Sequence, residues 1–158
     1  MTTDKHINST GKHVNKNVII SIKGIQTSVD NNSNTLELVT EGKYYKKNGS
    51  YFLSYKESEV TGMQGTTTTL KINKEGIITL MRFGLVNTQF IFEQGQKHVS
   101  YYDTTSGTFT IGVLANNVDI NVDENGGEIK VDYCLEIDNS KAGENDLYLH
   151  IREAKTLS

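Results

Sequence analysis

The chain has 158 residues, enough for one compact domain with its own core but too few for two of ordinary size. It contains no proline and no tryptophan, which excludes collagen-like and proline-rich disordered chains. Sixteen basic against 19 acidic residues give a net charge of −3. Because binding a phosphate backbone requires a basic excess, we expect no nucleic-acid partner.

The sequence predicts a cytoplasmic protein. Cys134 is the single cysteine, which excludes an internal disulfide and fits a reducing compartment. Residues 1–16 are polar and contain no apolar signal segment, and no stretch approaches about 18 consecutive apolar residues. We therefore expect no membrane partner.

Ten strands and no helix are predicted after a polar tail. Residues 1–16 offer nothing that would repay the entropy of ordering, so we predict a flexible N-terminal tail there and a single domain over residues 17–158. From residue 17 on, segments rich in Val, Ile, Thr, Tyr and Phe alternate with Gly, Asn and Asp clusters, which is typical of an all-β meander. The expected strands are residues 17–29, 35–47, 50–58, 66–73, 76–84, 87–94, 97–105, 108–122, 127–138 and 146–154.

The Asn48-Gly49 pair is the strongest hairpin signal in the chain. A type I′ turn needs a positive φ at both central positions, which Asn and Gly tolerate best. This turn places Lys43 opposite Ser54 on an outward face. The inward face then carries Leu36, Leu38, Thr40, Tyr44, Tyr51, Leu53, Tyr55 and Glu57.

The later turns assign faces to the remaining strands in the same way. The middle strands are predicted to direct inward Leu70, Ile72, Ile77, Met81, Phe83, Phe90, Phe92, Val99 and Tyr101. The last strands are predicted to direct inward Val118, Ile120, Val122, Ile129, Val131, Tyr133, Leu135, Ile137, Leu147, Leu149 and Ile151. One continuous apolar face is best buried when the sheet rolls up, because closure removes exposed edges. We therefore predict an antiparallel up-and-down β-barrel of about 8–10 strands rather than a sandwich.

Four segments, in order along the chain, carry a resemblance to a known family. They are residues 20–26 (ISIKGIQ), 59–68 (EVTGMQGTTT), 81–84 (MRFG) and 102–108 (YDTTSGT). Together they resemble the DUF1934 family of YwiB-like bacterial proteins, over about residues 17–153. The resemblance implies a calycin-like, that is lipocalin-like, β-barrel in a bacterial cytosol, and it implies no function. The chain departs from secreted lipocalins because Ile25 and Gln26 follow Gly24, where those proteins have Gly-x-Trp.

Glu57 is the first candidate for a functional residue. The predicted register places its carboxylate among tyrosines on the inward face, where burial demands a partner or raises the pKa. A polar anchor for a ligand is one interpretation. The alternatives are a bulge at the strand end that turns Glu57 outward, or a tyrosine hydroxyl that simply satisfies it.

Arg82 is the second candidate. The predicted register places it outward, as a structural arginine in one row with Gln89 and Tyr102. The sharper alternative is an arginine that binds an anion or a carboxylate, with these two residues as hydrogen-bonding neighbours. A single bulge would instead swing Arg82 inward and make it a partner for Glu57.

Two surface features follow from the same registers. Ile78, Leu80 and Ile91 are predicted to form an outward apolar patch, which either another layer of strands or a second subunit would cover, so a homodimer through these residues is one expected partner. The segment of residues 58–65 contains two glycines and few anchors, and we expect a mobile flap at one mouth of the barrel.

Signals for catalysis, metals and cofactors are poor. The chain lacks the Gly-x-Ser-x-Gly, Walker, His-x-x-x-His and Cys-x-x-Cys patterns, so we predict no catalytic residues and no cofactor. Asn121, Asp123 and Asn125 imitate the start of a calcium loop, but alternating strands flank them where such loops need helices. We predict a hairpin turn there and no metal site.

The leading hypothesis is a barrel that binds a small, largely apolar molecule. Tyrosines combine apolar surface with a hydroxyl that orients a ligand. The predicted ligand-binding residues are Tyr44, Tyr51, Tyr55, Glu57, Arg82 and Tyr101. The alternative is a structural or protein-interaction module with a packed barrel and no ligand. An enzyme comes third, and would require Glu57, Arg82 and a tyrosine to converge.

Overall fold

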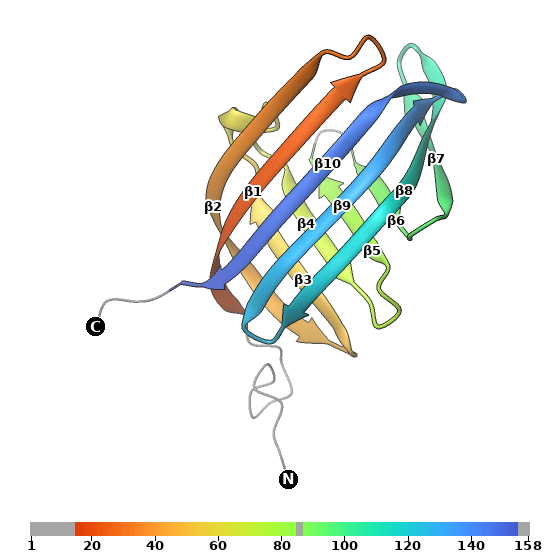
Figure 1. Cartoon of the computed structure of the whole chain (residues 1–158). Helices are drawn as coiled ribbons and strands as arrows, with labels where there is room; N and C mark the ends of the chain where they lie inside the picture. Colours follow the sequence, from red (N-terminus) through yellow and green to blue (C-terminus); the bar gives the residue numbers. More distant parts are fainter. Residues whose placement is uncertain (1–14, 85–86, 155–158) are drawn as a thin grey trace.

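The computed structural model describes residues 15–84 and 87–154 (Figure 1). The ten predicted strands are confirmed, and a single short 3-10 helix, η1, joins them within these ranges. The elements are β1 Lys16–Ser28, β2 Ser33–Lys47, β3 Ser50–Lys56, η1 Glu59–Thr61, β4 Thr67–Ile72, β5 Ile78–Phe83, β6 Thr88–Phe92, β7 Lys97–Thr104, β8 Gly107–Asp123, β9 Gly126–Ile137 and β10 Ser140–Glu153. The predicted flexible tail lies outside the described residues except at its last two positions, and Lys16 already begins β1.

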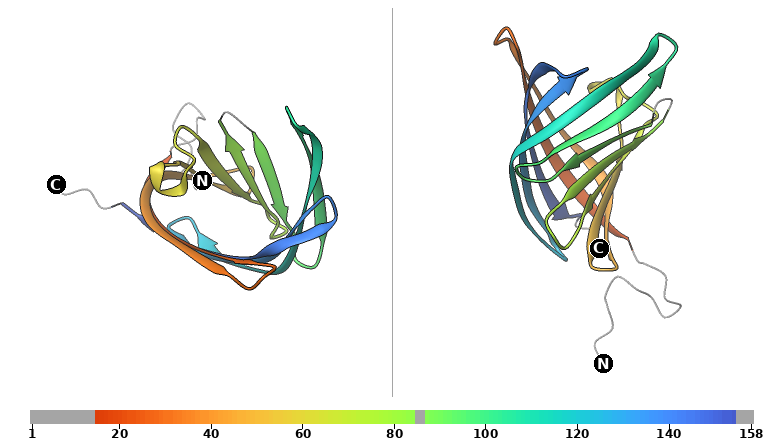
Figure 2. Two further views of the ribbon diagram at one scale, coloured as in Figure 1. Left: turned by 90° about the horizontal axis from the view of Figure 1, so that it is seen from above. Right: turned by 90° about the vertical axis from the view of Figure 1, so that its right-hand side faces the viewer.

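All ten strands form one antiparallel sheet in the order β6-β5-β4-β3-β2-β1-β10-β9-β8-β7. Every strand pairs with the next strand along the chain except β6, which does not pair with β7. In addition β1 pairs with β10, so β6 and β7 are the two edges of the sheet. The ribbons curl into an almost complete ring when seen from above (Figure 2). The predicted up-and-down barrel is therefore confirmed as a nearly closed one.

Side chains bridge the seam between β6 and β7, where no backbone ladder forms. The Tyr102 hydroxyl accepts a hydrogen bond from the Gln89 amide and donates one to the Gln89 carbonyl, both 3.1 Å long. The Ser100 hydroxyl donates to the same carbonyl at 3.3 Å. These bonds occupy backbone groups that an unpaired edge strand would otherwise expose.

The Asn48-Gly49 turn confirms the register of the first hairpin. Asn48 has φ 52° and Gly49 has φ 80°, the positive values that a type I′ turn needs. Lys43 lies opposite Ser54, as predicted. Tyr44, Leu53 and Tyr55 are consequently buried inside the barrel.

The predicted faces of β5 are wrong. Ile78 and Leu80 are buried in the core, whereas Phe83, predicted inward, is 52% exposed. The loop of residues 73–77 has an odd number of residues, so Ile78 lies opposite Ile72 and shares its inward face. The predicted outward patch of Ile78, Leu80 and Ile91 therefore does not exist, since only Ile91 keeps an outward position in this row. A homodimer stays a prediction without this surface.

The predicted inward position of Tyr101 is also wrong. Tyr101 is 75% exposed and Val99 is 46% exposed, whereas Tyr102 is buried. Because β6 and β7 are not paired, the inward face of β6 does not fix the faces of β7.

The core fills the barrel from the end at which the β8–β9 turn lies to its middle. Its largest fully buried side chains are Tyr44, Phe92, Ile20, Leu53, Leu70, Ile78, Ile129, Leu149, Ile151, Val18 and Val113. In the part of the chain that is described, no helix has the length and apolar character to cross a membrane.

Candidate functional site

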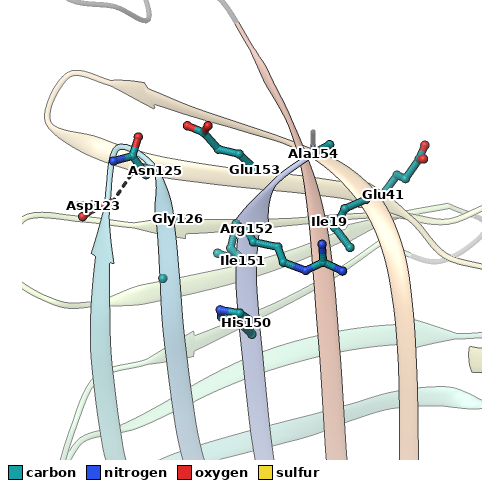
Figure 3. A pocket seen from close by; sticks show the side chains of 11 residues that line it. Ile19, Glu41, Asp123, Asn125, Gly126, His150, Ile151, Arg152, Glu153 and Ala154 are labelled. Atoms are coloured by element: carbon teal, nitrogen blue, oxygen red, sulfur yellow. Dashed lines mark hydrogen bonds between the residues drawn. The ribbon is translucent and has the colours of Figure 1, made fainter. Parts of the chain in front are cut away.

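One large hollow lies on the outer wall of the barrel. It measures about 920 Å³ and lies where β1, β2 and β10 meet the β8–β9 turn. Figure 3 shows Glu41, His150 and Arg152 along the outer surface of β2 and β10. Ile19 of β1 is apolar and faces outward, and it lies opposite Glu41 of β2 on one side and Arg152 of β10 on the other. This hollow faces solvent and has charged side chains along its wall, so it would leave much of an apolar molecule in contact with water.

A second cavity of about 320 Å³ lies inside the barrel, at the end opposite the β8–β9 turn. It is at the lower end of the range for small-molecule pockets, which is about 300–1,000 Å³. Seven strands and the segment after β3 contribute to its wall. Its apolar lining comes from Ile22, Leu36, Leu38, Leu70, Leu80, Leu147 and Leu149, and its polar lining includes Gln26, Asn34, Tyr55, Glu57, Arg82, Tyr133 and Asn145.

The polar side of this cavity is built on one row across neighbouring strands. Tyr55 of β3 lies opposite Thr68 of β4, and Thr68 lies opposite Arg82 of β5. Glu57 follows Tyr55 by two residues, so period-two alternation directs it to the same inward face. Its amide donates to the Thr66 carbonyl at 2.8 Å, which extends the β3–β4 pairing beyond the end of β3 and holds Glu57 inward.

Glu57 and Arg82 are both held in the barrel but do not pair with each other. Glu57 is 7% exposed, and its Oε1 accepts a 2.7 Å hydrogen bond from the Thr68 hydroxyl. The Arg82 Nε is buried and has no hydrogen-bond partner. Both residues lie in the described range, and no ion pair joins them. The cavity therefore contains a guanidinium whose charge and N–H groups are not neutralised by Glu57.

Two tyrosines beside these charges keep their protons at neutral pH. Burial, followed by the negative charge of Glu57, raises the pKa of Tyr55 far above its ordinary value, although the Arg82 charge opposes this shift. Burial also raises the pKa of Tyr133, and again Arg82 acts in the opposite direction. Both hydroxyls are consequently protonated donors and not bases, and the Tyr55 hydroxyl is already engaged with the Glu57 carboxylate.

Gly24 keeps one wall of the cavity open. It lies on β1 two residues after the inward-facing Ile22, opposite Leu36 of β2 and Leu147 of β10. A Cβ built on Gly24 would meet no heavy atom within 4 Å. Any larger side chain at this position would project into the cavity.

The segment between β3 and β4 lies at the mouth of the cavity, the place predicted for residues 58–65, and its mobility stays a prediction. Val60, Thr61 and Met63 contribute to its lining. The Ser58 hydroxyl caps η1 by accepting from the Val60 amide, and Gly62 ends η1 with φ 75°. Val60 is 62% exposed, so this cover has an apolar side chain at the surface.

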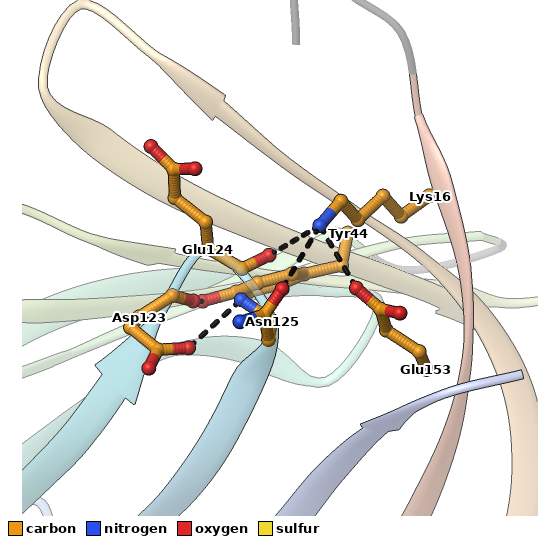
Figure 4. Close-up of polar contacts among 6 residues, drawn as sticks. All are labelled: Lys16, Tyr44, Asp123, Glu124, Asn125 and Glu153. Atoms are coloured by element: carbon orange, nitrogen blue, oxygen red, sulfur yellow. Dashed lines mark hydrogen bonds and ion pairs between the residues drawn. The ribbon is translucent and has the colours of Figure 1, made fainter. Parts of the chain in front are cut away.

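The other end of the barrel is closed by polar contacts (Figure 4). The Tyr44 hydroxyl donates to the Asp123 carbonyl at 2.8 Å. Lys16 donates to the Glu124 carbonyl at 3.0 Å and pairs with the Glu153 carboxylate at 2.9 Å. A ligand would therefore enter the cavity from the η1 end.

Of the six predicted binding residues, the structure brings three together. Tyr55, Glu57 and Arg82 line the cavity. Tyr44 and Tyr51 stack on each other, with ring centroids 5.5 Å apart, towards the closed end and outside the cavity lining. The exposed Tyr101 is outside the barrel.

Sequence reasoning missed Thr68 and Tyr133 as members of the site. Tyr133 was on a predicted inward face, but nothing in the sequence connected β9 with β5 across the barrel. Thr68 was hidden in a run of four threonines whose alternation fits either face. Within residues 15–84 and 87–154, no group of three or more His, Cys, Asp or Glu side chains could hold a metal ion.

Comparison with known proteins identifies the family. A profile described as "Domain of unknown function (DUF1934)" matches residues 20–149. The chain belongs to the DUF1934 family. A relative in this comparison, "Uncharacterized beta-barrel protein YwiB" of Bacillus subtilis strain 168, is 27% identical over 121 residues, which cover 77% of this chain and 80% of that protein.

A solved structure has the same fold as this DUF1934 protein. The crystal structure of the ywiB protein from Bacillus subtilis matches with a TM-score of 0.76 and 20% identity, over 89% of this chain and 94% of that one. The DUF1934 description names no function, so a proposal of function must be argued from the chemistry of the cavity.

Proposed function

We propose that this DUF1934 protein binds one small, largely apolar molecule inside its barrel. The observation that carries the proposal is the 320 Å³ cavity, which has an apolar wall and a few convergent polar groups. Ligand pockets are typically of this kind, because apolar surface supplies the affinity and a few polar groups orient the ligand.

The difference between the two ends of the barrel supports binding over a merely packed interior. Small barrels normally close with their side chains touching. Tyr44, Ile129 and Ile151 fill the closed end in this way and are almost completely buried. At the η1 end Gly24 leaves open space instead.

Binding is also favoured over catalysis. Glu57, Arg82 and Tyr55 do converge, as the third hypothesis required. The hydroxyl of Tyr55 keeps its proton because its pKa is raised, so it is not a general base. Glu57 is already bound by Thr68. These groups are arranged to hold and orient a polar group.

A neutral fluorescent probe, N-phenyl-1-naphthylamine, tests the proposal. The wild-type protein should bind one probe per chain with a strong rise in fluorescence. The Gly24→Phe variant should lose this signal, because the new ring fills the cavity. Native mass spectrometry of protein purified from its own host should likewise find a bound molecule that Gly24→Phe lacks.

Lys23→Phe is the matched control. Lys23 precedes Gly24, is exposed and faces outward, so the same ring is added to the outer wall. This variant should bind the probe as the wild type does. Equal binding by the Gly24→Phe variant, or no binding by the wild type, would contradict the proposal and favour a protein-interaction module with no ligand.

A further inference from the structure

The cavity contains an arginine that lacks an anionic partner. Arg82 lies inward on β5, opposite Thr68 of β4 and Thr88 of β6. Its side chain is half-buried, and its Nε is buried with no hydrogen-bond partner among the described residues. A buried charge that is neither paired nor hydrogen-bonded costs free energy, so such groups are normally paired with an opposite charge.

The obvious internal partner is already bound elsewhere. Glu57 lines the same cavity, yet its Oε1 accepts from Thr68 and it forms no ion pair with Arg82, although both residues are described. Arginine presents its N–H groups in a planar fork that matches the two oxygens of a carboxylate. The Arg82 side chain, whose Nε has no partner among the described residues, thus lines a cavity that also has an apolar wall.

We infer that the molecule bound in the barrel is a small amphiphilic monocarboxylate, whose carboxylate pairs with Arg82. This inference rests on the proposed function. The apolar part of the ligand lies against Ile22, Leu38, Leu147 and Leu149. The protonated hydroxyl of Tyr133, which lines the same cavity, is a second donor to the carboxylate.

The charged groups and the volume of the cavity narrow the class of ligand further. Arg82 can pair with one negative charge, whereas the acidic residues Glu57 and Asp146, which also line the cavity, repel any further one. A phosphate monoester carries about 1.5 to 2 negative charges at neutral pH, so it fits less well than a carboxylate. A cavity of about 320 Å³ is also small for a long acyl chain. A monocarboxylate with an acyl chain of medium length matches this charge and this volume.

Calorimetric titration with decanoate, decanol and decyl phosphate at neutral pH tests the inference with the wild-type protein alone. Hydrogen bonds to charged groups contribute more than neutral ones, so decanoate should bind roughly tenfold or more tightly than decanol. Decyl phosphate should bind more weakly than decanoate. Similar affinities for decanoate and decanol, or a preference for the phosphate, would overturn the inference.

Two matched variants locate the effect at Arg82. Arg82→Met should lower the affinity for decanoate at least tenfold and leave the affinity for decanol almost unchanged. The variant should therefore no longer prefer decanoate over decanol. Arg152→Met is the control, since the only other arginine of the chain lies exposed on the outer wall. If decanoate and decanol both bind and Arg82→Met changes neither, the inference fails while the proposed function stands. If the wild type binds neither these ligands nor the neutral probe, the proposed function itself fails.

Discussion

The hydroxyl of Thr68 donates a 2.7 Å hydrogen bond to Oε1 of Glu57, and both side chains are buried in the barrel wall. Thr68 lies between Tyr55 and Arg82 in the cross-strand row, so it contacts the strand on each side of β4. Thr68 binds Glu57, and Glu57 forms no ion pair with Arg82, although all three residues are described.

Removal of this hydroxyl should destabilise the barrel. Thr68→Val keeps the shape but removes this donor from the buried Glu57 carboxylate, which should lower the free energy of unfolding by about 1–3 kcal/mol. Urea denaturation measures the change. Thr67→Val, at the neighbouring half-buried position that faces outward, should have almost no effect. Equal losses in the two variants would show that the bond to Glu57 contributes nothing specific.

Stability should fall at alkaline pH because of Tyr55. Its pKa is raised in the folded barrel, first by burial and then by Glu57, above the ordinary value of 10.0. The folded state therefore keeps a proton that the unfolded chain releases. This stability is fully present below about pH 10 and is lost above it, by up to about 1.4 kcal/mol per pH unit.

The Tyr55→Phe variant should show a shallower alkaline loss in urea titrations between pH 7 and pH 11. Tyr44 and Tyr133 have raised pKa values for the same reason, burial, so part of the loss remains. Tyr101→Phe removes the same hydroxyl from a side chain that is 75% exposed and serves as the control. A Tyr55→Phe slope identical to wild type would contradict the assignment.

Two inward glycines on adjacent strands should respond oppositely to alanine. A Cβ on Gly42 would lie 2.6 Å from Ile20 Cδ1 and 2.7 Å from the Ser54 carbonyl oxygen, so Gly42→Ala should cost about 1–3 kcal/mol. Gly24 has open space, and Gly24→Ala should stabilise the strand by up to about 1 kcal/mol. Melting temperatures check both signs, and a destabilising Gly24→Ala would argue against the open wall.

Tyr44→Phe should weaken the closed end without affecting the cavity. The variant loses the 2.8 Å hydrogen bond to the Asp123 carbonyl, which should cost about 0.5–1.5 kcal/mol. Tyr51→Phe keeps the stacked ring and serves as the control. Probe binding should survive in both variants. A Tyr44→Phe variant as stable as wild type would mean that the bond to Asp123 does not close the barrel.

The sequence predicts the strands well because alternation of apolar and polar residues is a local signal. The predicted register of the first hairpin was also correct, since the two-residue turn at Asn48-Gly49 allows only one pairing of the flanking strands. The faces of β5 were not predictable in the same way. Strand β5 has apolar residues on both faces. A loop predicted one residue too short before Ile78 therefore gave a pattern as plausible as the correct one.

The candidate site was only half predictable for a related reason. Glu57 could be placed from the hairpin on which it follows Tyr55. The partners of Glu57 and Arg82 depend on the β5 register and on which walls face each other across the barrel, and Tyr133 reaches the site from β9. Residues on opposite walls share no pairing and no sequence proximity, so only the closed three-dimensional arrangement brings them together.

The chain is suited to circular permutation because the unpaired seam lies between β6 and β7, in the middle of the sequence. The first and last strands lie side by side, and the Ala154 amide donates to the Asn17 carbonyl at 3.0 Å. A chain joined there by a linker and opened between β6 and β7 would run through the sheet in order from one edge to the other. The β1–β10 pairing, now the most distant in sequence, would become a hairpin. Because folding speeds up as contacts become more local, the permuted chain is expected to reach the same barrel faster.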